Sequence, residues 1–174
     1  MIITIAGHSG SGKSTFAELK QKELNNDAVI IGMDNFYFGK QRLFRTSNWA
    51  DNPAYCDINR LIHCITQLRK GEPTLIPQFS PVLQDRTQDV VVQPRNHIIV
   101  DGLWTLTFAQ LREISDQKYF VDAPLKTRLS RRVVRDVNKG WSGKETENRA
   151  FLVESLGSRF IEPYKQYANF IVKF

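Results

Sequence analysis

The chain has 174 residues, of which 41% are hydrophobic and 24% charged, and it carries a net charge of +6. This is the length of one ordinary domain and allows a sizeable buried core. The composition excludes a disordered tail, a collagen-like repeat and a coiled-coil rod, and no apolar run approaches the roughly 18 residues that cross a bilayer. We expect a single domain over residues 1–174.

Two further features of the sequence bear on the cellular compartment of the protein. The first 13 residues, MIITIAGHSGSGK, lack the basic start and the long apolar run of a signal peptide. The two cysteines, Cys56 and Cys64, lack zinc-site spacing and are too few for a disulfide framework, so we expect free thiols. Both features predict a cytoplasmic protein.

The positive charge is concentrated in one segment. Between residues 126 and 144 there are seven lysines and arginines against one acid, so the rest of the chain is nearly balanced. A local excess predicts one cationic surface that faces an anionic partner. Nucleic acid and nucleotide phosphate both meet that description.

Short apolar runs alternate with stretches of helical periodicity. In chain order we expect a strand at 2–6, a helix at 13–24, a strand at 28–32, a helix at 57–70, and strands at 97–100, 119–121 and 170–174. The strands at 97–100 and 119–121 are each followed by a helical pattern. This alternation predicts an α/β fold, with a five-stranded, mostly parallel sheet that is covered by helices on both faces.

Two segments depart from the alternation. Apolar runs at 74–79 and 89–93, separated by the polar stretch 84–88, predict a small hairpin over about residues 72–95. Residues 38–55 form a long polar and aromatic segment, and connections of that length are usually functional or mobile.

Residues 7–14, GHSGSGKS, match the motif G-x-x-x-x-G-K-[ST] at every position. Its glycines let backbone N–H groups turn toward phosphate oxygens, and the helix that follows adds the positive end of its dipole. Lys13 is placed to reach the β- and γ-phosphates, and the Ser14 hydroxyl to hold Mg²⁺. We therefore expect ATP with Mg²⁺ to bind at Gly7, His8, Ser9, Gly10, Ser11, Gly12, Lys13, Ser14 and Thr15. The His8 side chain occupies a variable position of the motif, and we expect it to face solvent or the phosphates.

Two acids follow predicted strands and should lie beside this loop, because ligands of an open α/β sheet gather beyond the carboxyl ends of its strands. Asp34 could accept the proton of an attacking hydroxyl or help to hold Mg²⁺, and a turn cap is the alternative. Asp101 stands where P-loop proteins place an acid that orders the metal, and a simple Asp-Gly turn is the alternative.

The helical stretch after residue 121 carries the excess charge. Its arginines share one stripe, at spacings of i, i+3, i+4 and i+7: Arg128, Arg131, Arg132 and Arg135. Its apolar residues run along another face: Leu125, Leu129, Val133 and Val137. This pattern predicts a helix that is buried on the apolar face and lined with arginine on the other. Such a helix suits a lid, over about residues 126–145, that neutralises charge on a triphosphate and excludes water. A solvated or nucleic-acid-binding face is the alternative.

The sequence resembles the uridine kinase/phosphoribulokinase family of P-loop kinases over nearly its whole length, and within it the uridine-cytidine kinases. The resemblance rests on GHSGSGKST at 7–15, MDNFY at 33–37, DNPAYCD at 51–57, the stretch 71–79 and the lid helix 127–136. It implies that Asp34 is the catalytic base and that Asp51 binds the ribose hydroxyls. It also implies that the hairpin covers the nucleoside.

The resemblance further implies which side chains serve nucleotide and acceptor. Tyr37, Tyr55 and Phe79 would wall the acceptor ring. Arg128 and Arg132 would stabilise the transferred phosphoryl group, with Arg132 also on the acceptor side. Arg131 and Arg135 would hold the nucleotide.

The chain departs from the family mainly on the acceptor side. Gln84 stands where uridine-cytidine kinases usually carry a base-reading histidine. Phe79 and Ser80 replace a tyrosine and an aspartate of the hairpin. Asp101 replaces a glutamate, and Lys139-Gly140-Trp141 replaces the usual R-G-R after the lid helix.

We therefore expect an ATP-dependent small-molecule kinase, whose acceptor is most simply the 5′-hydroxyl of a uridine- or cytidine-like nucleoside. Nicotinamide riboside, pantothenate and a sugar phosphate remain open as acceptors, as does a regulatory NTPase without an acceptor. Nucleic-acid binding is disfavoured, because only Trp141 could supply a stacking aromatic within the basic segment. We expect no nucleic-acid or membrane partner, and the sequence does not determine the oligomeric state.

Overall fold

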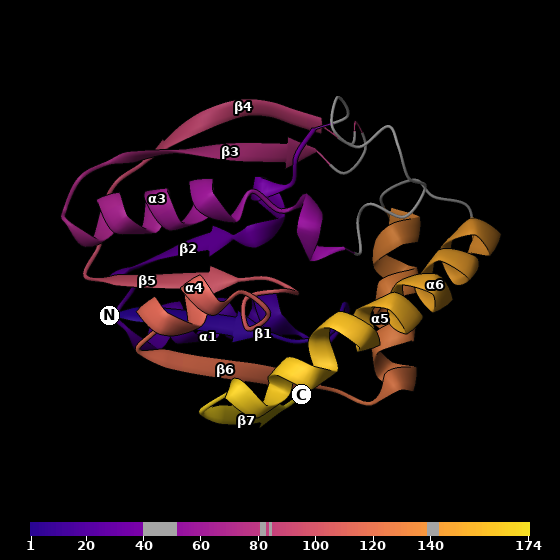
Figure 1. Cartoon of the computed structure of the whole chain (residues 1–174). Helices are drawn as coiled ribbons and strands as arrows, with labels where there is room; N and C mark the ends of the chain where they lie inside the picture. The colour runs from indigo at the N-terminus through magenta and orange to yellow at the C-terminus, as the bar shows by residue number, and fades with distance from the viewer. Residues whose placement is uncertain (40–51, 81–82, 84, 139–142) are drawn as a thin grey trace.

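The computed structural model describes residues 1–39, 52–80, 83, 85–138 and 143–174 (Figure 1). Its strands are β1 (Ile2–Ala6), β2 (Ala28–Gly32), β3 (Thr74–Ser80), β4 (Asp85–Val92), β5 (His97–Asp101), β6 (Gln117–Asp122) and β7 (Phe170–Lys173). Its α-helices are α1 (Lys13–Glu23), α3 (Ile58–Arg69), α4 (Ala109–Ile114), α5 (Leu125–Asn138) and α6 (Gly143–Ile161). Three short 3₁₀ helices are also described: η1 (Met33–Phe36), η3 (Pro53–Tyr55) and η4 (Glu162–Tyr167).

The five strands predicted for the main sheet are confirmed. They run in the order β2-β5-β1-β6-β7, and every neighbouring pair is parallel. All five residues of the central strand β1 are buried, as a strand covered on both faces requires. All the strands therefore present their carboxyl ends at the same edge, and the P-loop leaves β1 at that edge.

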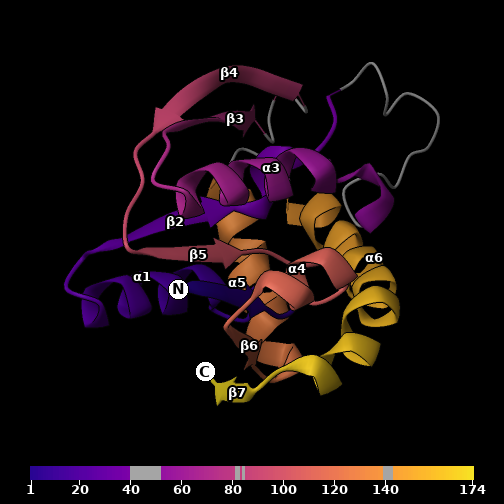
Figure 2. The same cartoon turned by 60° about the vertical axis from the view of Figure 1, so that its left-hand side comes forward.

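Successive residues of β1 point to opposite faces of the sheet, and each face has its own cluster of buried side chains. Ile3 and Ile5 pack with Phe16 and Ala17 of α1 on one face. The other face packs against α3, α4 and the end of α6, and its buried side chains include Ile2, Leu61, Ile65, Leu111 and Ile161. Figure 2 shows α1 separated from α4 and α6 by the strands. The predicted three-layer arrangement is thus confirmed.

The hairpin is present, but its second strand is longer than expected. β4 begins at Asp85, four residues before the predicted run at 89–93, and it pairs antiparallel with β3. Most of β4 is exposed, so its polar residues 85–88 can take part in the backbone ladder without being buried. Arg60 of α3 ties the hairpin to the main body through an ion pair of 2.7 Å with Asp89.

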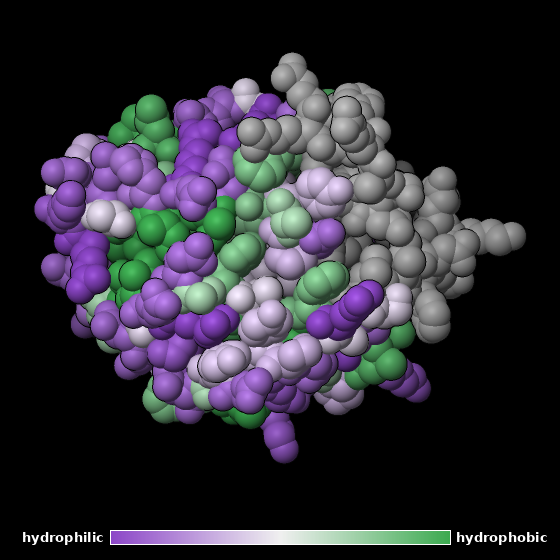
Figure 3. All heavy atoms as spheres, viewed as in Figure 1, coloured by the Kyte–Doolittle hydropathy of each residue, from purple (hydrophilic) through white to green (hydrophobic). Residues whose placement is uncertain are grey.

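A hollow on the face seen in Figure 3 lies away from the P-loop. A cavity of about 490 Å³ is lined by Met1, Ile2, Leu68, Arg69 and Ile98 among others, so it opens at the amino-terminal ends of the strands. Ligands of parallel sheets bind at the opposite edge. Among the described residues, no helix is both long and apolar enough to cross a membrane.

Gly157, inside α6, offers a direct test of how this helix packs. A Cβ atom built there would meet Ile161 Cδ1 at 3.5 Å and His8 Nδ1 at 3.8 Å, which are ordinary contacts. Because glycine weakens a helix interior, Gly157→Ala should raise the free energy of unfolding by about 0.5–1 kcal/mol. Urea denaturation of the two proteins measures the difference. A lower stability of the variant would contradict the packing of α6 against the P-loop.

Candidate active site

The P-loop ends in a free helix amino terminus. Gly12 precedes α1 in a left-handed conformation, no side chain caps the helix, and its first turn contains no acid. The first backbone N–H groups of a helix have no partner inside it, so they are available to an anion. This is the electrostatic setting that a triphosphate needs.

Two glycines of the loop allow other elements to approach closely. Gly10 has a φ of +79°, and a Cβ atom there would come within 2.4 Å of the Arg128 carbonyl oxygen. Gly12 has a φ of +99°, and its Cβ would come within 2.7 Å of the Phe174 ring. Both positions therefore require glycine, on steric and on conformational grounds. The loop is held between the start of α5 and the end of β7.

Ser14 and Asp101 meet beside the loop. The Ser14 hydroxyl donates a hydrogen bond of 2.6 Å to Asp101 Oδ2, while Asp101 Oδ1 is buried and has no hydrogen-bond partner. A hydroxyl and a carboxylate with a spare oxygen are hard oxygen donors that suit Mg²⁺. The described residues contain no group of three or more His, Cys, Asp or Glu that could hold a metal, so phosphate and water oxygens would have to complete the shell.

Lys13 lies among these groups. Its ammonium donates a hydrogen bond of 2.9 Å to the His8 carbonyl oxygen. Burial lowers the pKa of Lys13, and the carboxylates of Asp101 and Asp34 oppose that effect. Both acids therefore act on the Lys13 ammonium, which is the grouping that the sequence predicted.

The sheet register explains why Asp34 and Asp101 come together. Asp101 pairs with Gly32 at the end of β2 and with Ile5 at the end of β1. Asp34 follows Gly32 by two residues, in the exposed first turn of η1, and the P-loop follows Ile5 at the same distance. The ends of three adjacent strands thus deliver the loop and both acids to one place.

On the acceptor side, Tyr37 is largely enclosed. It is 4% exposed, its hydroxyl accepts a hydrogen bond of 2.8 Å from the Trp104 indole, and its ring meets Phe79 edge-on at 5.8 Å. Tyr55 and Phe79 are partly buried against the same core. Tyr37 and Phe79 therefore do lie together, with Tyr37 built into the core rather than open to solvent.

Sequence reasoning missed the residue that joins the hairpin to η1. Arg86 of β4 donates to the carbonyl oxygens of Tyr37 at 2.9 Å and Phe36 at 3.0 Å, and it also reaches Asp57 at 3.2 Å. Asn35 adds a further link by accepting a hydrogen bond from the Phe79 N–H at 3.2 Å. No pattern along the chain marks Arg86, because its partners are backbone carbonyls from a distant segment.

The arrangement of α5 differs from the prediction. The buried residues of this helix are Arg128, Arg132 and Asp136, whereas Leu125 is 48% and Val137 44% exposed. The expected burial of the apolar face is therefore wrong at both ends of the helix, while Leu129 and Val133 are partly buried. Acidic partners explain the reversal, because Glu154 binds Arg128 at 2.6 Å and Asp136 lies 3.4 Å from Arg132. A buried arginine is tolerated once it is paired.

The other two arginines of the stripe are exposed, as expected. Arg135 reaches Ser9 of the P-loop at 3.4 Å and also binds Asp136. Arg131 is exposed on the outer side of α5. Arg135 thus brings its side chain to the loop.

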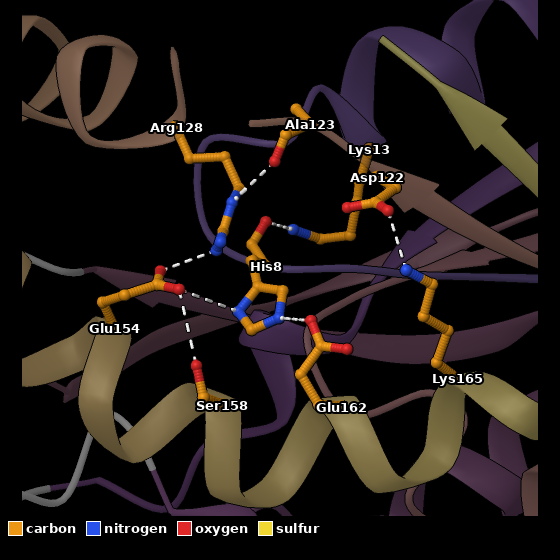
Figure 4. Close-up of polar contacts among 9 residues, drawn as sticks. All are labelled: His8, Lys13, Asp122, Ala123, Arg128, Glu154, Ser158, Glu162 and Lys165. Atoms are coloured by element: carbon orange, nitrogen blue, oxygen red, sulfur yellow. Dashed lines mark hydrogen bonds and ion pairs between the residues drawn. The ribbon is translucent and has the colours of Figure 1, made fainter. Parts of the chain in front are cut away.

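His8 also differs from the prediction. Its side chain is 2% exposed and lies between the carboxylates of Glu154 and Glu162, as Figure 4 shows. It does not face solvent, because α6 and η4 cover it. Four predicted positions, Asp51, Gln84, Lys139 and Trp141, lie outside the described residues.

Both cysteines are buried, free thiols, as predicted. Burial raises the pKa of Cys56 to about 12, and the nearby Asp34 and Asp57 carboxylates act in the same direction. The thiolate is the nucleophile that attacks thiol reagents. Relative to an ordinary thiol of pKa 9.0, the thiolate fraction at pH 8 should be about a thousandfold smaller.

The native protein should therefore resist Ellman's reagent at pH 8, and should react rapidly at both cysteines once guanidinium unfolds it. Because the native state keeps the Cys56 proton, this residue's contribution to stability should fall as pH rises from about 9 toward 12. Rapid labelling of the native protein would contradict the burial of these thiols.

A parallel sheet with a P-loop at its central strand, a lysine and two acids at the strand ends, and an arginine-bearing helix above them define a P-loop phosphotransferase. The model of the phosphoribulokinase/uridine kinase family matches residues 2–174. The chain belongs to this family.

Individual relatives agree with the assignment. A uridine kinase from Enterobacter sp. (strain 638) is 35% identical over 183 residues, which cover 99% of this chain and 86% of the relative. A solved structure from Silicibacter sp. TM1040, provisionally named a fructose transport system kinase, has a TM-score of 0.82 at 22% identity, covering 98% of this chain and 88% of the other. Phosphoribulokinase from Rhodobacter spheroides has a TM-score of 0.71 at 14% identity, covering 99% and 69%. At these identities the two structures support the fold alone.

Proposed function

We propose that this protein transfers the γ-phosphoryl group of ATP to the 5′-hydroxyl of a nucleoside. The observation that carries the proposal is the meeting of Lys13, Asp101 and Asp34 at the ends of adjacent strands, where both carboxylates act on the Lys13 ammonium. The choice of a nucleoside is supported by the uridine kinases that match the chain over 86% of their length.

The nucleotide phosphates would lie over the start of α1. Backbone N–H groups of the P-loop would hold their oxygens, and Lys13 would exchange the His8 carbonyl oxygen for the β- and γ-phosphates. Arg135 lies at Ser9 and could close on the same phosphates. The predicted contacts of Arg131 and Arg132 with nucleotide and acceptor complete this part of the proposal.

Ser14 and Asp101 fit Mg²⁺, because one buried carboxylate oxygen is without a partner beside the hydroxyl. These two residues would hold the ion, and Asp34 is a further candidate. When bound, Mg²⁺ would neutralise phosphate charge. The protein's own contribution is to place Lys13 and the helix amino terminus where charge develops.

Asp34 would act as the base. It is exposed at the start of η1, and its carboxylate acts on the Lys13 ammonium. As the acceptor oxygen bonds to the γ-phosphorus, the bond from that phosphorus to the β-bridging oxygen breaks and ADP leaves. Asp34 takes the hydroxyl proton, and most of the acceleration comes from positioning and charge stabilisation. Tyr37 and Phe79, joined edge-on, would back the acceptor ring.

A coupled ADP-release assay with ATP and Mg²⁺ tests the proposal. The panel comprises uridine, cytidine, adenosine, nicotinamide riboside, pantothenate, ribulose 5-phosphate and no acceptor. Release that requires a nucleoside, with the 5′-monophosphate identified by mass, supports it. ADP release that requires another compound of the panel would identify that compound as the acceptor in place of a nucleoside. Slow release without any acceptor would favour a regulatory NTPase.

A further inference from the structure

One polar cluster lies next to the P-loop, and its glutamates have no part in the chemistry above. It joins His8, Arg128 of α5, Glu154 and Ser158 of α6 and Glu162 of η4, and Figure 4 shows His8 at its centre. The two glutamates come from the far end of the chain, 146 and 154 residues after His8. The cluster is therefore a tertiary connection between the nucleotide loop and the helices that follow the lid.

The geometry defines which bonds hold His8. Its Nε2 lies 2.6 Å from Glu162 Oε1, a short hydrogen bond, whereas its Nδ1 lies 3.7 Å from Glu154 Oε1, beyond hydrogen-bond range. Burial and the Arg128 guanidinium lower the pKa of His8, while Glu162 and Glu154 oppose that effect. The short contact fits a hydrogen bond that Nε2 donates to the Glu162 carboxylate. Glu154 is neutralised instead by Arg128, at 2.6 Å.

The same residue holds Lys13 through its backbone. The His8 carbonyl accepts the Lys13 ammonium at 2.9 Å, so the side chain of His8 faces α6 while its carbonyl faces the lysine. A displacement of the loop at residue 8 would therefore move Lys13 and the phosphate-binding N–H groups together. An error of about 1 Å in such a site can cost about a hundredfold in rate.

We propose that the His8 side chain is a positioning residue, which fixes the P-loop to η4 through Glu162 and thereby sets the affinity for ATP. The proposal rests on the proposed ATP-dependent function only in its choice of ligand. It assigns to η4 a role in nucleotide binding, although no residue of η4 reaches the phosphate-binding groups described above.

His8→Phe is the informative variant. Phenylalanine keeps a flat ring against Phe120, which His8 meets edge-on at 6.3 Å, but removes the hydrogen bond. Glu162 is 46% exposed and can turn to water, and Glu154 retains Arg128, so no buried charge is left unpaired. His8→Gln is the matched rescue, because its amide can donate where Nε2 does. Glu162→Gln weakens the same bond from the other side.

The control is Lys165→Met. Lys165 joins η4 to Asp122 of β6 at 2.7 Å. The Lys165→Met variant loses this link between η4 and the sheet. Its ATP affinity therefore shows how much binding is lost when η4 is merely loosened.

The measurement is calorimetric binding of MgATP to each protein, together with the melting temperature and the KM values for ATP and for the acceptor. We expect His8→Phe to weaken ATP binding about tenfold, His8→Gln to stay within about threefold of the parent, and the acceptor KM to remain unchanged. Equal ATP affinity in the parent and His8→Phe would overturn the proposal, and so would an equal loss in Lys165→Met. Because binding is measured directly, a failure to find an acceptor would leave this test intact.

Discussion

Replacing Asp34 with asparagine should lower kcat by about a thousandfold while leaving the KM for ATP within about threefold, since a general base typically contributes 10²–10⁴-fold. Asparagine has the same shape but cannot take the proton of the acceptor hydroxyl. Asp34 is exposed at the start of η1, so the fold should tolerate the change. Initial rates of ADP release at saturating ATP and acceptor measure the effect.

The matched control for this variant is Asp27→Asn. Asp27 is partly buried, and it bonds to Asn96 at the amino-terminal end of the strands, at the opposite edge of the sheet. Its kcat should equal that of the parent. If Asp34→Asn kept a rate within tenfold of the parent, Asp34 would not be the base, and its place in the fold would be that of a turn residue.

Replacing Asp101 with alanine should lower kcat/KM for MgATP by about a hundredfold or more, and raising the magnesium concentration should recover part of the loss. The reason is local: Asp101 holds the Ser14 hydroxyl at 2.6 Å and has a buried oxygen without a partner, so its removal weakens the metal-binding pair. Rates titrated with Mg²⁺ at fixed ATP measure the shift.

Asp101→Glu is the companion variant. It keeps the carboxylate. The uridine kinases that this chain resembles carry a glutamate at the equivalent position, so we expect most of the activity to remain. An Asp101→Ala protein with the parent's magnesium dependence would show that Asp101 serves the strand end alone, as an Asp-Gly turn. Asp101→Ala thus tests the loss of the carboxylate, and Asp101→Glu tests a longer side chain that keeps it.

The altered burial of α5 changes how the arginine helix can work. Arg128 and Arg132 are buried beside Glu154 and Asp136, so part of their charge is already balanced. Two arginines of the stripe remain exposed, and Arg135 touches the P-loop at Ser9. We therefore expect Arg135→Ala to act on the binding of the nucleotide directly. Loss of Arg128 would act less directly, because it would also leave Glu154 without its cation.

The sequence by itself determined the main sheet and the meeting of the P-loop with two acids at one edge of it. A strand that is covered on both faces has to be apolar throughout, so the runs at 2–6, 28–32 and 97–100 could be recognised locally. Parallel strands end at a common edge, so a P-loop after one strand and acids after two others had to converge. These inferences need only short-range patterns and one topological rule.

The tertiary structure alone decided the extent of β4, the buried face of α5 and the place of His8. In each case the deciding partner is remote in sequence. Arg86 reaches back 49 residues to the Tyr37 carbonyl, Arg128 finds Glu154 26 residues later, and His8 finds Glu162 154 residues later. Periodicity ranks side chains by hydrophobicity, and it carries no information about whether a distant carboxylate will neutralise a charge. A helix can therefore bury two of its four arginines and expose Leu125 once acids neutralise the buried charges.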